Sequence, residues 1–101
     1  MIAFCDLPEC ERFRLRDAIE EHGGYIATYD GDGVQISMPR DYRAFCDKMC
    51  SLGLVRDAGS THLFPLGTDN PPESLRHDGS YPGSRAFWMT ATFYVPNFIL
   101  F

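Results

Sequence analysis

The chain has 101 residues, of which 45% are hydrophobic and 14% aromatic, and fourteen acidic against nine basic side chains give it a net charge of −5. This length is typical of one domain, and this composition excludes a disordered chain. The acidic balance argues against direct nucleic-acid binding, which needs clustered lysine and arginine to displace counterions from phosphates.

The N-terminal quarter predicts a strand followed by a helix. Residues 1–5 are apolar and predict a short buried strand. Asp6 is expected to cap the N-terminus of the helix, and the helix should run to His22, where Gly23 can adopt the left-handed conformation that ends it. The side chains expected to face the core share a helical spacing, and they are Leu15, Ala18, Ile19 and His22.

Residues 25–38 predict a β-hairpin. Side chains alternate over residues 25–29 and again over 34–38, and the segment between them reads Asp-Gly-Asp-Gly. Glycine permits the positive φ that tight hairpin turns need, so Asp30 and Asp32 are expected at the tip of the hairpin.

A second helix should follow, opened by Pro39 in its first turn and ended by Gly53. Its apolar side chains recur with a period of 3.6 residues, which is typical of a helix face turned to the core. These side chains are Tyr42, Phe45, Cys46, Met49 and Leu52.

The remainder of the chain predicts strands around a long loop. Residues 54–57 and 61–66 predict two short strands, and residues 67–84, rich in proline and glycine, predict a long irregular loop. Aromatic and β-branched side chains predict a last strand over 85–95, ended by Pro96. The whole order predicts a single α+β domain over residues 1–101. Two helices should pack on one face of a mainly antiparallel sheet, with a ferredoxin-like split βαβ topology preferred.

The four cysteines are expected to be buried thiols. Cys46 and Cys50 are four residues apart on the apolar face of the predicted second helix, whereas zinc ligands usually come from a turn that wraps the metal. The sequence therefore predicts no metal and no cofactor. No export segment is visible in residues 1–5, and the charge-free stretch 86–101 is too short and too polar for a membrane span. We expect a soluble cytoplasmic protein with reduced thiols and no membrane contact.

Acid–base capacity is concentrated in one short stretch of the predicted loop, which contains Arg76, His77, Asp78 and Tyr81. These residues define one hypothesis, a small histidine-dependent hydrolase, in which His77 or His62 would act as the acid or base. No nucleophile elbow, phosphate-binding loop or dinucleotide fingerprint is present, so no catalytic residue is assigned and an enzyme is not the favoured interpretation.

The segment 52–64 resembles the centre of the HicA-type mRNA-cutting toxins, in which a helix leads into a strand and a Gly-Ser-His turn carries the catalytic histidine. The resemblance implies an RNase. Here Thr61 stands in the place of that histidine and His62 follows it. Because side chains alternate along a strand, this offset of one residue is expected to turn His62 to the other face. The basic surface of that family is also missing.

The favoured function is a small acidic module that binds or inhibits a partner protein by occupying it. Between Asp17 and Asp47 seven acids stand against two bases, and these carboxylates are expected to gather on one exposed pole. Small acidic phage proteins, anti-CRISPR proteins among them, act on partners with basic nucleic-acid-binding surfaces in this general manner. The predicted partner-binding residues are the acids Glu20, Glu21, Asp30 and Asp32 and the anchor pair Trp88 and Tyr94.

The alternative from another class is a homo-oligomeric regulatory domain that binds a small ligand. The charge-free C-terminal segment could bury its apolar surface against a second copy and so form a homodimer.

Overall fold

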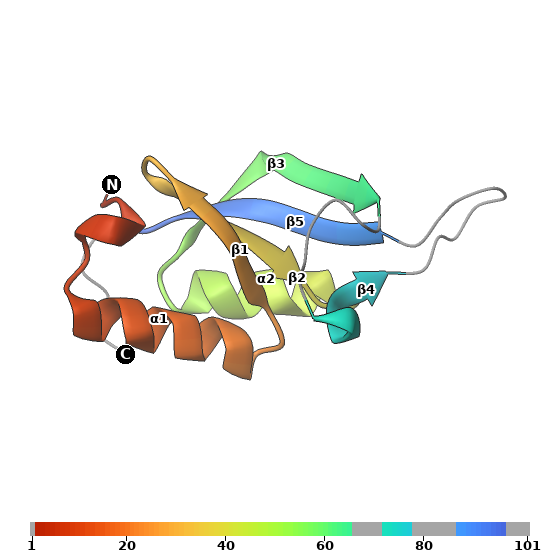
Figure 1. The fold of residues 1–101 in the computed structure, drawn as a ribbon, viewed down its shortest axis with the longest axis horizontal. Helices are drawn as coiled ribbons and strands as arrows, with labels where there is room; N and C mark the ends of the chain where they lie inside the picture. Colours follow the sequence, from red (N-terminus) through yellow and green to blue (C-terminus); the bar gives the residue numbers. More distant parts are fainter. Residues whose placement is uncertain (1, 66–71, 78–86, 97–101) are drawn as a thin grey trace, which may run out of the picture.

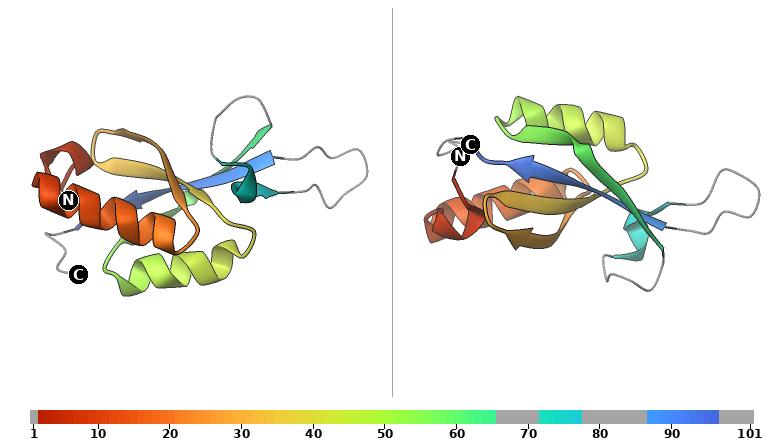
Figure 2. Two further views of the ribbon diagram at one scale, coloured as in Figure 1. Left: turned by 60° about the horizontal axis from the view of Figure 1, so that its bottom comes forward. Right: turned by 90° about the horizontal axis from the view of Figure 1, so that it is seen from above.

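The computed structural model of the chain describes residues 2–65, 72–77 and 87–96, and it has the α+β architecture predicted above (Figure 1). The predicted residues Asp78 and Tyr81 lie outside these ranges. The elements, in chain order, are η1 Phe4–Asp6, α1 Glu9–Glu21, β1 Tyr25–Asp30, β2 Gly33–Met38, α2 Tyr42–Ser51, β3 Val55–Pro65, η2 Glu73–Leu75, β4 Arg76–His77 and β5 Phe87–Tyr94. Both helices cover the same face of the sheet (Figure 2).

The sheet is antiparallel, in the order β1-β2-β5-β3, and β4 pairs with the beginning of β5. Because β2 and β3 both run antiparallel to β5, they are parallel to each other. Helix α2 joins them, and β5 lies between them, which makes a split βαβ unit. In the same way, β1 and β5 are parallel to each other, because both pair antiparallel with β2, which lies between them. Helix α1 leads into β1. The backbone N–H of Ile2 donates to the carbonyl oxygen of Val95 (2.8 Å), so the chain begins beside the end of β5.

Residues 2–5, the described part of the strand expected over residues 1–5, do not form it. Ile2 makes a single bridge with Val95, and Phe4 begins the turn η1. The central place in the sheet, between β2 and β3, is taken by β5, whose eight residues are rich in β-branched and aromatic side chains. The central position between β2 and β3 is therefore not open to residues 2–5. The core side chain of this segment is Phe4, which packs on the ring of Tyr29 (4.8 Å between centroids).

Helix α1 begins later than expected. Asp6 belongs to η1, and Pro8 is the residue before the first helical turn, where no side chain caps the helix. The C-terminal prediction is confirmed, since Gly23 has a φ of +91°. Leu15 and Ile19 are buried as expected, whereas His22 is exposed because it lies beyond the last helical residue.

The hairpin is confirmed, with Gly31 at a φ of +58° in the first central position of its turn. One irregularity was not expected. The register shifts between Ile26 and Thr28, so Ala27 is an extra residue in β1. This bulge places Ile26 opposite Ile36 and Tyr29 opposite Val34, and the side chains of both β1 residues therefore lie on the helix side of the sheet.

Helix α2 starts at Tyr42, and Pro39 is not part of it. The side chain of Asp41 accepts a hydrogen bond from the backbone N–H of Ala44 (3.3 Å) and caps the helix in place of the predicted proline start. The predicted apolar face is confirmed, with Phe45 and Met49 fully inside the core. In the part of the chain that the structure describes, neither helix has the length and apolar character needed to cross a bilayer.

The two short strands predicted on either side of residues 58–60 are one strand, β3, with a large bulge. Asp57 lies opposite Thr92 and His62 opposite Thr90, so three residues of β3 are extra. The hydroxyl of Ser60 accepts from the backbone N–H of Thr92 (2.8 Å) and donates to the carbonyl of Asp57 (2.6 Å). A side-chain oxygen thus replaces a backbone acceptor in the ladder and lets the strand continue.

The segment expected to be a long irregular loop, 67–84, contains ordered structure in its described part. η2 leads into β4, where His77 lies opposite Phe87 and Arg76 opposite Trp88. The described residues of this segment therefore extend the sheet beyond the end of β2.

Candidate functional site

The face of the sheet turned away from the helices carries a row of polar side chains across all four main strands. Thr28 lies opposite Gln35, Gln35 opposite Thr92, and Thr92 opposite Asp57. Residues directly opposite in an antiparallel pair point to the same side, whereas the next residues along β2 and β5 are buried in the core. Both helices lie on the opposite face of the sheet (Figure 2).

A hollow of about 490 Å³ lies on this face around Gly33. A Cβ atom at Gly33 would lie 2.6 Å from Cγ2 of Thr92 and 3.4 Å from Cε1 of Tyr94. These two side chains therefore approach the backbone so closely that only glycine fits at this position. The described residues that line the hollow are Thr28, Asp32, Gly33, Gln35, Thr92 and Tyr94. They offer one carboxylate together with hydroxyl and amide groups, a set suited to accepting hydrogen bonds from a cation.

Two of the acidic residues predicted to bind a partner, Asp32 and Glu20, lie at opposite ends of the hairpin. Asp32 lies at the tip and lines the hollow around Gly33, whereas Glu20 lines a different hollow with Tyr25 and Leu75. Strand β1 separates the two places, and its six residues span about 20 Å. The expectation of a single acidic pole is therefore wrong. Exposed Glu21 lies with Glu20 at the end of α1, and the side chain of Asp30 is outside the described part of the structure.

The predicted anchor pair is also divided. Trp88 and Tyr94 are on the same face of β5, but only Tyr94 borders the hollow. Trp88 lies at the other end of the strand, between Phe64 and Arg76 on the neighbouring strands, and only 7% of its surface is exposed. A side chain buried to this extent is part of the packing of the domain, so we do not include Trp88 in the candidate contact surface.

Three of the four thiols are exposed, which corrects the expectation that all are buried. Cys5, Cys10 and Cys50 lie at the surface, and only Cys46 is in the core, where its thiol donates to the sulfur of Met38 (3.5 Å). The expectation failed for Cys5 because it lies in η1 rather than in a strand. Burial raises the pKa of Cys46 above its ordinary value of 9.0. Among the described residues, no three histidine, cysteine or acidic side chains come together as a metal site.

The two histidines considered for catalysis have separate environments. His77 is buried; its Nε2 lies 2.8 Å from the carbonyl oxygen of Met38, and its ring stacks on Phe87. His62 is exposed on the outer face of β3, and its described contact is the edge of the Phe64 ring. These contacts give His77 a structural role, with its Nε2 already occupied. Among the described residues, no neighbour of His62 that would activate it is found.

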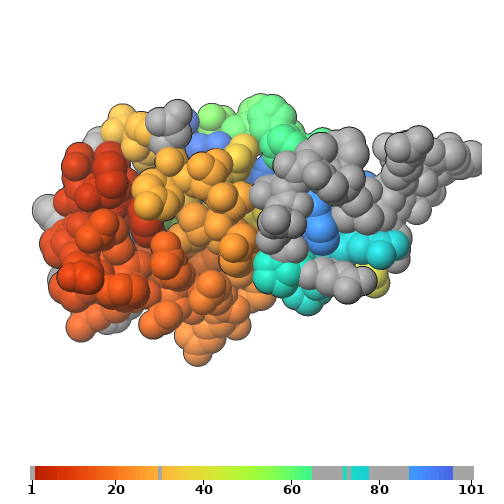
Figure 3. All heavy atoms as spheres, in the orientation of Figure 1, coloured from red at the N-terminus to blue at the C-terminus, as the bar shows by residue number. Residues whose placement is uncertain are grey.

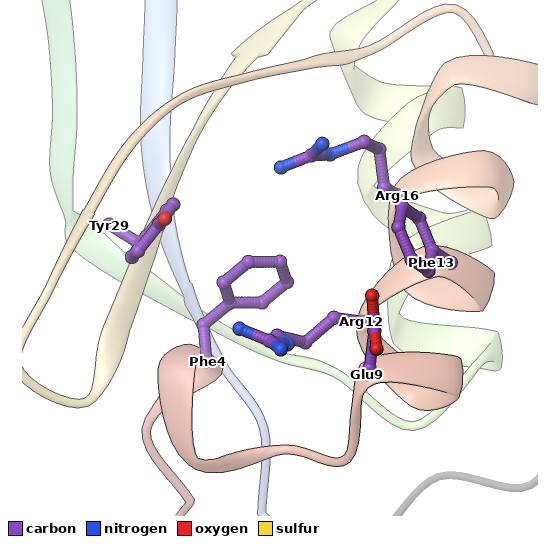
Figure 4. Close-up of a pocket in the computed structure, with 6 residues that line it drawn as sticks. All are labelled: Phe4, Glu9, Arg12, Phe13, Arg16 and Tyr29. Carbon is purple, nitrogen blue, oxygen red and sulfur yellow. The ribbon is translucent and has the colours of Figure 1, made fainter.

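A second cavity, of about 170 Å³, lies between η1, α1 and β1 and was not predicted (Figure 4). Its lining combines two arginines with three aromatic rings, and the residues are Phe4, Glu9, Arg12, Phe13, Arg16 and Tyr29. One signal in the sequence pointed to it. Arg12 and Arg16 are four residues apart and so share a face of the helix, with Phe13 beside them.

Comparisons with protein-family models, with curated proteins and with solved structures gave no match to this chain.

Proposed function

We propose that this protein binds a partner protein through the outer face of its sheet, with the hollow around Gly33 receiving a basic side chain of the partner. The observation that carries the proposal is the position of Asp32 and Tyr94 on the rim of the same hollow. These two residues combine a carboxylate with a large aromatic ring, and aromatic residues are enriched at the centres of protein interfaces.

Charge supports a basic partner. The chain carries a net charge of −5, and Asp57 continues the polar row of the hollow on the far side of Thr92. One oxygen of Asp57 accepts from the backbone N–H of Gly59 (3.1 Å), which holds the carboxylate at the surface. A guanidinium group that entered the hollow could be bound by Asp32 and lie against the ring of Tyr94. A protein with an exposed basic surface, such as a nucleic-acid-binding protein, would be recognised in this way. Binding would cover that basic surface and so inhibit the partner.

The alternative, a homodimer closed by the C-terminal segment, has less support. Most of the described part of that segment is β5, a central strand whose residues Ala91, Phe93 and Val95 (the last just after β5) are fully buried in the core of the same chain. These side chains are not available to a second copy. The residues beyond 96, on which this alternative also depends, lie outside the described part of the structure.

The test uses an arginine-rich peptide as the probe and isotope-labelled protein observed by NMR. We expect saturable shifts centred on Asp32, Gly33 and Tyr94, and a peptide with citrulline in place of arginine should lose them. Asp32→Asn should weaken binding about threefold or more, the range of one exposed ion pair. Glu20→Gln removes the same charge at the other end of β1 and is the matched control.

Equal weakening by Asp32→Asn and Glu20→Gln would overturn the proposal, because it would mean that the peptide responds only to net charge. Shifts spread over all exposed carboxylates would have the same meaning. To find a natural partner, wild-type protein and the Tyr94→Ala variant are each used as bait in affinity capture. A partner of this site should be captured by the wild-type protein and not by the variant.

A further inference from the structure

The cavity between η1, α1 and β1 is built on the helix side of the sheet, away from the hollow around Gly33. Figure 3 shows η1 and α1 adjoining β1 on one face of the molecule, and Figure 4 shows the guanidinium groups of Arg12 and Arg16 extending from α1 toward Phe4 and Tyr29. Two positive charges therefore reach the same small space from successive turns of one helix.

Neither of these arginines has an ion pair or hydrogen bond among the residues that the structure describes. By contrast, Arg14, between them on the helix, lies 3.8 Å from the carboxylate of Glu11. The chain contains fourteen acidic residues, so partners for two arginines were available. Guanidinium groups that are unpaired and directed into a cavity are ready to hold a phosphate or carboxylate group, for which their forked geometry is suited.

The walls of the cavity are aromatic. Phe4 is buried and tilted by 50° against Tyr29, whereas Phe13 and Tyr29 leave 53% and 46% of their surfaces exposed. Large rings this exposed beside a cavity offer faces and edges for a planar group to pack against. Glu9 also lines the cavity and repels a second negative charge, which favours a ligand with its charge at one end only.

We propose that this cavity binds a small organic anion consisting of a planar ring and one phosphate or carboxylate group. Arg12 and Arg16 hold the anionic group, and Phe13 and Tyr29 contact the ring. The volume of about 170 Å³ is below the range of about 300–1,000 Å³ that drug-sized ligands occupy, so it suits a single ring with its anionic group. This site is independent of the proposed protein contact, because no residue lines both.

Phenyl phosphate is the first probe, measured by calorimetry and by the NMR shifts of Phe13 and Tyr29. We expect saturable binding of phenyl phosphate. Inorganic phosphate and benzyl alcohol should each bind at least tenfold more weakly, because each lacks one half of the ligand. Benzoate distinguishes the two anionic groups. Tighter binding of phenyl phosphate assigns the site to phosphates, and tighter binding of benzoate assigns it to carboxylates.

Three variants with the same change of charge complete the test. Arg12→Gln and Arg16→Gln should each weaken binding of phenyl phosphate about tenfold, the effect of one charge-assisted hydrogen bond. Arg14→Gln should leave it within about twofold of wild type. Thermal melts of the three proteins confirm that they are folded. No saturable binding of either probe, or an equal loss in Arg14→Gln, would overturn the proposal, and neither result would affect the test at Asp32.

Discussion

The imidazole of His77 is joined to the backbone of Met38, with 2.8 Å between Nε2 and the carbonyl oxygen. The two residues are 39 positions apart, and the bond connects β4 to the end of β2. Because the ring also stacks on Phe87 at 5.4 Å, His77 is held by a hydrogen bond on one side and an aromatic neighbour on the other. This arrangement explains how the short strand β4 is fixed to the sheet.

The first prediction concerns this bond. His77→Phe keeps the aromatic stack but removes the donor, so the buried carbonyl of Met38 loses its partner. We expect the free energy of unfolding to fall by about 1–3 kcal/mol in urea titrations. His62→Phe is the control, because His62 is exposed and its imidazole has no described hydrogen bond; it should change stability by less than about 0.5 kcal/mol. Equal losses in the two variants would contradict the structural role of His77.

The second prediction concerns the contact between Gly24 and Phe45. A Cβ atom at Gly24 would lie 2.4 Å from Cζ of Phe45 and 3.0 Å from Cγ2 of Ile19, which is closer than packed carbon atoms approach. Gly24→Ala should therefore lower the free energy of unfolding by about 1–3 kcal/mol through overpacking. In Gly59→Ala the new atom would meet only Asp57, at 3.6 Å. This control should melt at or slightly above wild type, because alanine lowers the entropy of the unfolded chain. A similar loss there would contradict overpacking as the cause.

The third prediction concerns the pH dependence caused by Cys46. Burial raises the pKa of its thiol in the folded state above the ordinary 9.0, so between the two values unfolding releases a proton. The stabilisation is complete below about pH 9 and is lost as the pH rises through the folded pKa. Wild-type protein should lose more thermal stability than Cys46→Ala between about pH 8 and about pH 10.

Cys10→Ser is the control for this effect, because Cys10 is exposed and is not among the groups that shift the pKa of Cys46, and it should follow wild type over the same range. Thiol accessibility gives a second measurement. In the folded protein a thiol reagent should react quickly with Cys5, Cys10 and Cys50 and slowly with Cys46. Four equally fast thiols in native buffer would be incompatible with the buried position of Cys46.

The fourth prediction concerns two hydroxyls on the outer face of the sheet. Ser37 and Thr90 lie opposite each other on β2 and β5, both are fully buried, and among the described residues neither hydroxyl oxygen has a hydrogen-bond partner. Thr90→Val keeps the shape and removes an unpaired polar group. We expect it to raise the free energy of unfolding by up to about 1 kcal/mol, and Ser37→Ala to be neutral or better. A loss of more than about 1 kcal/mol in Thr90→Val would reveal a partner for that hydroxyl.

The elements that were predicted correctly depend on residues close together in the chain. The apolar stripe of α2 is a property of spacing within ten residues, and the ends of both helices follow from Gly23 and Gly53, whose positive φ angles need no distant contact. The hairpin between β1 and β2 is local for the same reason. Its turn contains Gly31, and the connection of only two residues brings the strands side by side, where they pair with each other.

The candidate sites were predicted only in part. Asp32 and Tyr94 were named separately, and only the pairing of Gly33 with Tyr94 brings them to one hollow. The cavity with Arg12 and Arg16 was missed, because its other wall comes from β1 and η1, and whether an arginine is paired depends on what the fold places beside it.

The sequence alone therefore determined where helices, turns and alternating strands form, since propensity and period act between near neighbours. The tertiary structure decided which strand occupies the centre of the sheet. Residues 1–5 and the segment of β5 both had strand character in the sequence, but it is β5 that pairs along its length with β2 and β3, whereas Ile2 makes a single bridge with Val95. That choice left Cys5 at the surface and Phe4 against Tyr29, and so created the cavity beside α1.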